Sequence, residues 1–325
     1  MAVYTQLGAE QLAALIDHFD VGELISAKGI AEGVSNSNWL VETTGSGGAR
    51  FILTMYEYRI ELDDLPFFLS LLDHLAAHGC PVPRTIHDRG GALYRMIGDK
   101  AVALIEFLPG VSLSEPTAGQ ARAVGRALAQ LHLAAADFGQ TRANGMGLHE
   151  WQRLAGACGR EGLDGIDAGL ADTIAAELAH LAAHWPQDLP RGVIHADLFP
   201  DNVLMLGERV TGLIDFYFAC TDLIAYDVAV THAAWCFDNA GRAFDPAISA
   251  ALLEGYEMLR PLSEGERAAL PVLARGAALR FALSRAFDWI NTPADALVVK
   301  KDPLAFVRRL QFYADPANAG LFARP

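Results

Sequence analysis

Three polar side chains close together in the sequence are of the types that phosphoryl transfer needs. Asp197 and Asn202 lie five residues apart between two apolar runs, and Asp215 ends the next apolar run. A kinase requires a carboxylate that accepts or orients the proton of the attacking hydroxyl, and a divalent metal that bridges the phosphates. Oxygen atoms of Asp and Asn suit Mg²⁺ as ligands. The pattern therefore predicts transfer of a phosphoryl group from ATP to a hydroxyl.

Each of these residues also has a purely structural interpretation. Asp197 could cap a helix, and Asn202 could form a turn in an ordinary surface loop. Single Asp and Asn residues often have such roles. The ordered set H-x-D-x-x-x-x-N followed by I-D-F is far less common by chance, and it favours the catalytic interpretation.

The N-terminal third has the pattern of a small antiparallel sheet with a helix against it. We expect a hairpin turn at the glycine cluster 45–48, because glycine reaches positive φ without a steric penalty. Apolar residues at helical spacing predict a helix that ends at Gly79-Cys80-Pro81. The expected elements are helices at 11–19 and 61–78 and strands at 39–43, 51–56, 93–97 and 102–107.

Helical spacing dominates the rest of the chain, apart from a strand-rich interruption at 192–216 that contains the three polar residues. The expected helices include 121–136, 170–185, 268–291 and 304–313. We therefore expect an α+β fold in which residues 1–107 form a small antiparallel-sheet lobe and residues 108–325 a mainly helical lobe. A cleft between two lobes is a usual place for a ligand.

The composition is that of a packed globular protein, with 52% hydrophobic and 20% charged residues. A net charge of −14 repels phosphate backbones and anionic lipid, so we expect neither nucleic acid nor a membrane surface as a partner. Four scattered cysteines indicate buried free thiols in a reducing compartment. No run approaches the ~18 apolar residues of a membrane span, and the first ten residues lack a signal-peptide pattern. We expect a cytoplasmic protein whose oligomeric state the sequence leaves open.

In the polar segment the chain resembles the protein kinase-like fold, and within it the aminoglycoside and choline phosphotransferase superfamily. The spacing from Asp197 to Asn202 is that of the protein kinase pattern H-R-D-L-x-x-x-N, and Asp215-Phe216-Tyr217 matches D-F-G in part. The resemblance implies a bilobal kinase fold with ATP and Mg²⁺ as cofactors. It implies Asp197 as the catalytic base and Asn202 and Asp215 as metal ligands.

The same resemblance implies two supporting residues. His195 would brace the catalytic loop through hydrogen bonds. Asp227, in the segment A-Y-D-V-A, matches an aspartate that supports this loop in the superfamily. Without the resemblance, Asp227 is equally well explained as a carboxylate at a helix N-terminus.

The resemblance also implies two nucleotide-binding segments. The stretch 103–110 resembles the interlobe hinge, where the backbone around Glu106, Phe107 and Leu108 would pair with the adenine edge. Alone, it predicts a buried strand that ends in a turn. The loop over the phosphates would be 33–38, and its candidate ligands are Ser35, Asn36, Ser37 and Asn38. A small polar turn is the alternative there.

One position departs from the superfamily pattern. The strand 51–56 should carry a basic residue that steadies the α- and β-phosphates, yet Thr54 occupies about that position. We therefore expect Thr54 to face the nucleotide without a lysine. Phosphate stabilisation would come from Arg59, Lys100, backbone amides or the metal.

Further segments resemble bacterial homoserine kinases of the kinase-like type. The resemblance extends from about residue 5 to residue 313 and includes the segments L-T-M-Y-E, I-E-F-L-P-G, D-F-Y-F-A, W-C-F, L-R-F-A-L-S-R and K-K-D-P-L. It implies phosphorylation of the side-chain hydroxyl of L-homoserine, on the path to threonine. This small molecule carries a carboxylate and an ammonium group beside its hydroxyl.

Candidate substrate contacts follow from that chemistry. Arg280 and Arg285 lie five apart on an apolar helix, where an unpaired guanidinium is costly to bury. A bidentate contact with a substrate carboxylate would explain one of them, and a structural pair with Asp288 or Asp227 is the alternative. Asp222 or Asp227 could face the ammonium. Tyr217 is a candidate neighbour of the substrate because it follows Asp215.

Two other functions stay open. The same chemistry could act on choline, methylthioribose or an aminoglycoside, and a non-catalytic nucleotide-binding protein could share the fold. His180 and His184 have the i, i+4 spacing of helical metal sites, but no third ligand is evident, so a solvated helix face is the simpler interpretation. We expect the aromatic residues of the C-terminal half to form core rather than a cage for a quaternary ammonium; these are Trp235, Phe237, Phe281, Phe287 and Trp289.

Overall fold

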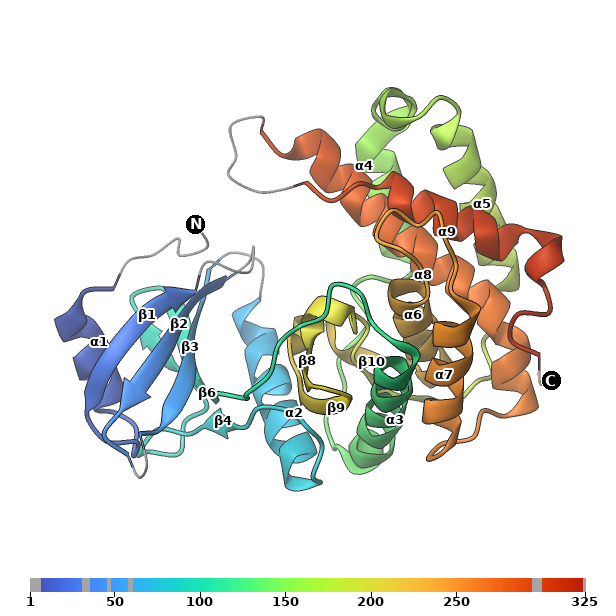
Figure 1. Cartoon of the computed structure of the whole chain (residues 1–325). Helices are drawn as coiled ribbons and strands as arrows, with labels where there is room; N and C mark the ends of the chain where they lie inside the picture. Colours follow the sequence, from blue (N-terminus) through green and yellow to red (C-terminus); the bar gives the residue numbers. More distant parts are fainter. Residues whose placement is uncertain (1–6, 31–35, 46–47, 58–60, 294–299, 324–325) are drawn as a thin grey trace. The chain divides into compact units, whose positions relative to one another are not determined.

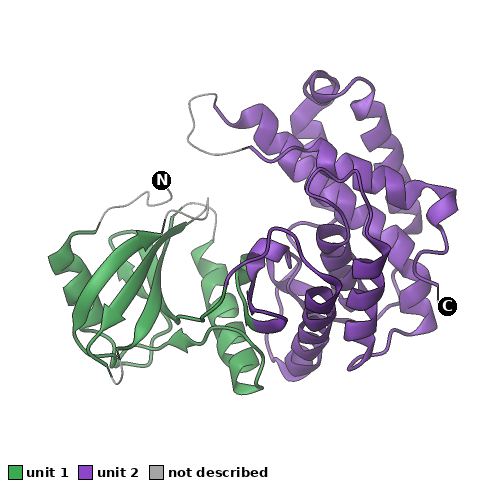
Figure 2. Cartoon of the chain, in the orientation of Figure 1, with its two compact units in different colours: residues 1–110, 211–217 green, residues 111–210, 218–325 purple. Residues whose placement is uncertain are grey.

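The structure is a computed structural model, and it describes residues 7–30, 36–45, 48–57, 61–293 and 300–323 (Figure 1). The chain forms two units (Figure 2). Unit 1 contains residues 1–110 and 211–217, and unit 2 contains residues 111–210 and 218–325. No sequence pattern assigned 211–217 to the first unit. The division into domains 1–107 and 108–325 stays a prediction.

Unit 1 contains an antiparallel sheet in which β1, β2, β3, β6 and β4 follow one another and β5 also pairs with β6. The strands are β1 (Leu24–Ile30), β2 (Asn36–Thr43), β3 (Arg50–Tyr56), β4 (Thr85–Ile86), β5 (Arg95–Ile97) and β6 (Lys100–Glu106). The helical elements are α1 (Ala9–Ile16), η1 (Leu62–Asp64) and α2 (Leu65–Ala77). Figure 1 shows α1 and α2 beside this sheet.

The two faces of the sheet are covered by different elements, as the alternation of side chains along a strand requires. One face packs Leu53 and Met55 of β3 against α1. The other face packs Tyr56 and Ala103 against α2, and Tyr217 lies against the same cluster.

Unit 2 is mainly helical. Its helical elements are α3 (Ala118–Ala134), η2 (Ala135–Asp137), α4 (Leu148–Ile166), α5 (Leu170–His184), η3 (Pro200–Asn202), α6 (Ile224–Trp235), α7 (Pro246–Glu257), α8 (Glu264–Asn291), α9 (Leu304–Ala314) and η5 (Pro316–Asn318). Its strands are β7 (Arg191–Ile194), β8 (Val203–Leu206) and β10 (Cys220–Leu223), and β10 pairs antiparallel with β7. The unit boundary crosses β9 (Arg209–Leu213) and η4 (Phe216–Phe218).

Close helix contacts hold unit 2 together. The helix α8 packs against α4, α5, α6 and α9, and α3 packs against α7. A Cβ atom on Gly255 would lie 2.0 Å from the carbonyl oxygen of Arg122, so only glycine allows α7 to approach α3 this closely. The helix α6 is buried from Ala225 to Trp235. It therefore forms the centre of this unit.

The predicted α+β content is confirmed, and so are most of the predicted helices and strands, with their ends moved by a few residues. Several elements were missed, among them β1 and α4. The strand β1 lies at an edge of the sheet and is mostly exposed, so it lacks a run of apolar residues. The helix α4 contains four glycines, one of them Gly159 at φ 66°, which obscure its periodicity.

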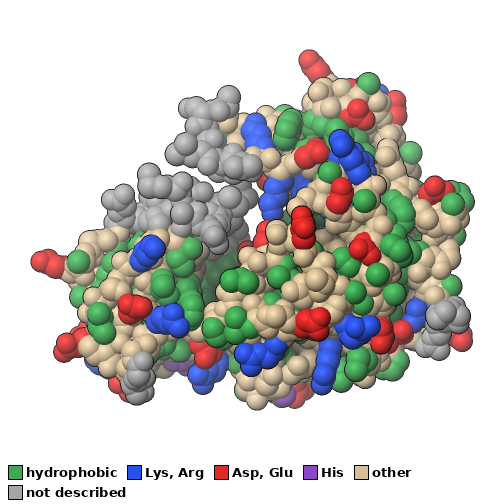
Figure 3. Space-filling model, in the orientation of Figure 1, with side chains coloured by type: hydrophobic (Ala, Val, Ile, Leu, Met, Phe, Trp, Pro, Cys, Tyr) green, Lys and Arg blue, Asp and Glu red, His purple; other side chains and the backbone are tan. Residues whose placement is uncertain are grey.

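The surface carries charges of both signs. Figure 3 shows Lys and Arg side chains interspersed with Asp and Glu side chains on the face drawn. Within the described ranges, no helix combines the length and the apolar character that a membrane span requires. The four cysteines are free and buried, as predicted.

Candidate active site

The loop that contains Asp197 connects β7 to β8 in unit 2. Within it, Ala196 has φ 63°, a left-handed conformation that is uncommon for a residue with a Cβ. Such backbone strain persists only where surrounding contacts hold it, and it is concentrated at functional sites. The indole of Trp235 also donates to the carbonyl oxygen of Leu198 at 2.9 Å. The conformation of the loop therefore depends on contacts from α6.

Asp227, in the first turn of α6, supplies the main contact. Its two carboxylate oxygens accept the backbone N–H groups of His195 and Ala196, each at 2.7 Å. His132 Nε2 lies 2.9 Å from the same carboxylate. Burial raises the pKa of Asp227, but the hydrogen bonds and charges of His132 and His195 outweigh it, so the pKa is lower than usual. The two interpretations that the sequence left open thus apply together, since Asp227 is both an N-terminal helix carboxylate and a support of the loop.

Asp197 is held by residues on both sides of the loop. The Asn202 amide Nδ2 donates to the Asp197 carbonyl oxygen at 2.8 Å and to its Oδ2 at 3.1 Å. The guanidinium of Arg280 lies 4.0 Å from Oδ1. The Asp197 side chain keeps 17% exposure, so it can reach a substrate.

Arg280 is buried behind this loop. Only 1% of the residue is exposed, and its guanidinium donates to the carbonyl oxygen of Ala196. It also stacks on the rings of Phe218 and Phe281, 5.1 and 4.6 Å from their centroids. These contacts favour a role in positioning the loop over a direct contact with a substrate carboxylate.

Arg285 has a different environment, one and a half helical turns further along α8. It is half-buried, and its guanidinium donates to the carbonyl oxygen of Asp302 at 3.2 Å. Neither arginine forms the alternative pair with Asp288 or Asp227 among the ion pairs of the described residues. Arg285 therefore remains a candidate for the substrate carboxylate.

In unit 1, Thr54 lies in β3 opposite Asn38 of β2 and Ala103 of β6. The Thr54 hydroxyl donates to Asn38 Oδ1 at 2.8 Å. Asn36 lies on the same face, since it is two residues from Asn38, and its buried Oδ1 has no hydrogen-bond partner. The sequence placed Asn36 to Asn38 in a loop, but they lie in β2, so the strand begins earlier than predicted.

Ser37 and Lys100 lie on the opposite face of the sheet. The Ser37 hydroxyl donates to Glu57 at 2.6 Å, and Lys100 forms an ion pair with the same buried carboxylate. Lys100 is three residues from Ala103 in β6, so its side chain points away from the face that carries Thr54. This ion pair makes Lys100 unsuited to replace the missing phosphate lysine. Ser35 and Arg59 lie outside the described residues.

The hinge candidates follow the end of β6. The carboxylate of Glu106 binds the guanidinium of Arg84 at 3.1 Å, and Arg50 stacks on the Phe107 ring at 4.5 Å. In the part of the chain that is described, the backbone groups of Phe107 and Leu108 form no recorded hydrogen bond. They are therefore available to a ligand such as an adenine edge.

Asp215 and Tyr217 lie in the segment 211–217 of unit 1. Asp215 has φ 64° and is exposed, and its charge contributes to raising the pKa of Tyr217, after burial as the main cause. The Tyr217 hydroxyl lies 3.2 Å from that of Tyr56.

Asn202 and Asp215 are the candidate metal ligands. The amide nitrogen of Asn202 points to Asp197, so the Oδ1 atom of Asn202 is left for a cation. The oxygen donors of Asn202 and Asp215 thus fit Mg²⁺ by their chemistry.

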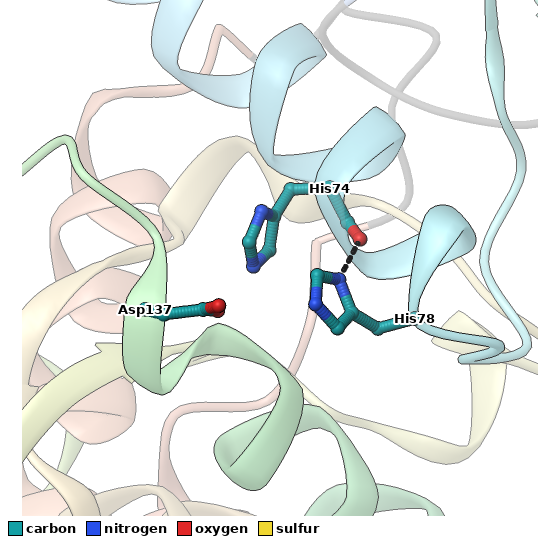
Figure 4. A group of neighbouring side chains, drawn as sticks. All are labelled: His74, His78 and Asp137. Atoms are coloured by element: carbon teal, nitrogen blue, oxygen red, sulfur yellow. Dashed lines mark hydrogen bonds between the residues drawn. The ribbon is translucent and has the colours of Figure 1, made fainter.

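Two histidine pairs of the chain have the i, i+4 spacing. His180 and His184 stack at 4.3 Å between ring centroids, and no third ligand joins them among the described residues. Figure 4 shows the corresponding pair on α2, where His78 Nδ1 lies 2.8 Å from the carbonyl oxygen of His74. Asp137 is drawn in the same figure but belongs to unit 2, so we assign no shared site to the three residues.

Sequence patterns did not identify the residues that contact Asp227. They also predicted that Trp289 lies in the core, which is wrong. The other ring nitrogen of His132 lies 2.8 Å from the Tyr256 hydroxyl, and no motif marked either residue. Trp235 and Phe281 are buried as predicted, whereas Trp289 is 42% exposed. The signal that could have identified His132 is a titratable residue on the apolar face of a helix.

The model of the phosphotransferase enzyme family matches residues 26–262. A homoserine kinase of Xanthobacter autotrophicus is 53% identical over 313 residues, which cover 96% of this chain and 96% of the relative. A homoserine kinase of Agrobacterium fabrum is 51% identical over 318 residues, covering 98% and 97%.

Solved structures with low sequence identity share the fold. An amicoumacin kinase in complex with AMP-PNP, Ca²⁺ and Ami superposes with a TM-score of 0.70 at 14% identity, covering 95% of this chain and 94% of that chain. A spectinomycin phosphotransferase in complex with ADP and spectinomycin gives 0.70 at 15% identity, covering 98% of both chains. These similarities confirm the predicted kinase-like fold.

Proposed function

The chain belongs to the phosphotransferase enzyme family and, within it, to the homoserine kinases, and we propose that it transfers the γ-phosphoryl group of ATP to the side-chain hydroxyl of L-homoserine. The observation that carries this function is the identity of about half of all residues with homoserine kinases over nearly the full length of both chains. The product is O-phospho-L-homoserine, an intermediate of threonine biosynthesis.

Asp197 is the proposed catalytic base. As the substrate oxygen attacks the γ-phosphorus, its proton passes to the Asp197 carboxylate, the bond to the β–γ bridging oxygen breaks, and ADP leaves. Asn202 orients the carboxylate by donating one hydrogen bond to Asp197 Oδ2 and a second to the Asp197 carbonyl oxygen. Arg280 and Asp227 hold the loop from behind. These contacts support Asp197 as the group that would touch the reacting hydroxyl.

The proposed nucleotide site is the face of the unit 1 sheet that carries Asn36, Asn38 and Thr54, together with the hinge backbone at Phe107 and Leu108. Asn202 and Asp215 would hold Mg²⁺. The bound ion supplies positive charge that offsets the phosphate charge, as the superfamily's lysine would have done in part.

The remaining proposals concern substrate contacts and location. Arg285 is the proposed partner of the substrate carboxylate, and Tyr217 stays a proposed neighbour of the site. Asp227 is fully buried and both of its carboxylate oxygens hold the loop, so it is not proposed as a partner of the substrate ammonium. A cytoplasmic location, without nucleic acid or membrane partners, is proposed from the four free cysteines and the net charge of −14.

The decisive experiment measures ADP release with ATP and Mg²⁺ against L-homoserine, choline, methylthioribose and kanamycin in parallel. The Asp197→Asn variant serves as the background for nonspecific ATP hydrolysis. We expect turnover on L-homoserine alone. Faster turnover on one of the other alcohols would contradict L-homoserine as the substrate. The proposed phosphoryl transfer from ATP to a hydroxyl would still stand.

A further inference from the structure

Two arginines of unit 2 stack on one aromatic ring. The guanidinium carbon of Arg285 lies 4.5 Å from the centroid of the Phe306 ring, and that of Arg309 lies 4.2 Å from the same centroid. Arg285 comes from α8 and Arg309 from α9, so the two helices bring like charges together at Phe306. Like charges in one apolar environment repel each other, so a compensating negative charge would stabilise this arrangement.

Neither guanidinium has a carboxylate partner within the described ranges. Arg285 donates to the carbonyl oxygen of Asp302 at 3.2 Å, and Arg309 donates to that of Asp238 at 2.9 Å. Arg309 is only 4% exposed, and its buried Nε has no hydrogen-bond acceptor. A buried cation without a counter-ion costs free energy.

The pKa values agree with this geometry. Burial lowers the pKa of Arg285 to about 10, although the more distant charges of Asp201, Asp302 and Asp197 act in the opposite direction. Burial also lowers the pKa of Arg309 to about 10, and the charge of Arg285 adds to the effect. The surrounding carboxylates therefore do not neutralise the pair.

The arginine pair is joined to the catalytic loop through aromatic contacts. The ring of Phe199, two residues after Asp197, lies 5.9 Å from that of Phe306 and 4.7 Å from that of Phe281. Asp197 is also close enough to Arg285 for its charge to affect the pKa of that guanidinium. These contacts link the arginine pair to the loop that carries the catalytic carboxylate.

We propose that Arg285 and Arg309, stacked on Phe306, form the site that binds the α-carboxylate of the amino-acid substrate. This inference rests on the proposed function. Arg285 is the more exposed of the two and donates hydrogen bonds to the carboxylate. Arg309 lies buried behind it and adds a second positive charge. Arg280 is excluded from this role because its guanidinium is engaged with Ala196 and Asp197.

The test compares L-homoserine with 3-amino-1-propanol, which has the same hydroxyl and amine but no carboxylate. The variants are Arg285→Met and Arg309→Met, which remove the charge and keep an unbranched side chain. Arg308→Met is the matched control on α9, because Arg308 already has a carboxylate partner, Asp302, at 3.4 Å. Dissociation constants from calorimetric titration and steady-state KM values are measured for each protein.

We expect Arg285→Met to weaken L-homoserine binding by about 10- to 100-fold, the loss typical of a charge-assisted hydrogen bond, and Arg309→Met to weaken it less. Neither variant should change the affinity for 3-amino-1-propanol by more than about twofold, and Arg308→Met should leave both affinities unchanged. Weaker binding of L-homoserine by the arginine variants, with folding verified by an unchanged Tm, would support the site even if the analogue does not bind measurably.

Three outcomes would overturn the proposal. Unchanged affinity for L-homoserine in both arginine variants, with a wild type that phosphorylates it, would refute the carboxylate site alone. Equal losses for both ligands would assign the arginines a purely structural role. A wild type without activity on L-homoserine would instead refute the proposed function, and the carboxylate site with it.

Discussion

The backbone N–H of His195 donates a hydrogen bond of 2.7 Å to the carboxylate of Asp227, which lies 32 residues later in the chain. The next N–H, that of Ala196, donates to the other carboxylate oxygen at the same distance. Two adjacent donors can share one carboxylate only if the backbone turns sharply, and Ala196 accordingly has φ 63°. The strained backbone at Ala196, which orients Asp197, is therefore held in place by the Asp227 carboxylate in the centre of unit 2.

This relationship predicts a large effect of Asp227→Asn. The amide offers one acceptor oxygen in place of two, and its NH₂ group would face a backbone donor. We expect unfolding free energy to fall by about 3–5 kcal/mol, because the partner of several buried groups is lost. We expect kcat to fall about 10²-fold through displacement of Asp197. Urea unfolding and steady-state kinetics measure the two effects; Asp288→Asn, at an exposed position of α8, is the control. A wild-type kcat in a destabilised Asp227→Asn protein would separate Asp227 from catalysis.

Asp197→Asn tests the base itself. The substitution keeps the shape of the side chain and removes its ability to accept a proton at neutral pH. We expect kcat to fall by about 10²- to 10⁴-fold, with little change in Tm. Asp201→Asn in the same loop is the matched control, because Asp201 is exposed and its carboxylate pairs with Lys301 at 3.3 Å. An Asp197→Asn enzyme with the kcat of the wild type would remove Asp197 from the mechanism.

Local patterns predicted the elements whose burial is regular. The helix α2 and the strands β3 and β6 have continuous apolar stripes, so their periodicity is visible in the sequence. The strand β1 has only one covered face at an edge of the sheet, and α4 owes its burial to contacts with α5 and α8. Such tertiary contacts outweigh the local secondary-structure propensity, and the spacing of residues in the sequence does not reveal them.

The candidate site shows the same limit at the level of single residues. The motif spacing placed Asp197 and Asn202 in one loop, since the two are near in sequence. It could not separate Arg280 from Arg285, because both lie on one apolar helix and only their partners in space differ. Arg309 was missed entirely, since it comes near Arg285 only through the packing of α9 on α8.

Asp215→Asn tests the proposed metal ligands. A carboxamide keeps an oxygen donor but loses the negative charge that favours a divalent cation. We expect the Mg²⁺ concentration for half-maximal activity to rise at least about tenfold. The measurement is an Mg²⁺ titration at saturating substrates, with Asp63→Asn, an exposed aspartate of unit 1, as the control. A titration curve identical to that of the wild type would contradict the assignment.

Arg280 should behave as a positioning residue, in contrast to Arg285. We expect Arg280→Met to lower kcat about tenfold or more while KM for L-homoserine changes little, because the Ala196 carbonyl oxygen loses its donor. Arg280→Lys should restore part of kcat, since an ammonium can still donate to that oxygen. A raised KM with an unchanged kcat in steady-state assays would instead place Arg280 in contact with the substrate.

The burial of His232 predicts that the folded protein loses stability in mild acid. His232 is fully buried between Ser249 Oγ at 2.8 Å and the Tyr313 hydroxyl at 2.7 Å. Burial lowers its pKa from 6.5 to about 3, so between these values the unfolded chain binds a proton that the folded protein does not. The contribution of His232 to the free energy of unfolding is therefore complete above pH 6.5. It is lost at about 1.4 kcal/mol per pH unit as the pH falls toward 3.

The test is urea unfolding at pH 7 and pH 5. Between these pH values the unfolding free energy of His232→Gln should fall by about 2 kcal/mol less than that of the wild type, because glutamine does not titrate. If His232→Gln lost as much stability as the wild type between these pH values, the ring would not be held neutral by burial.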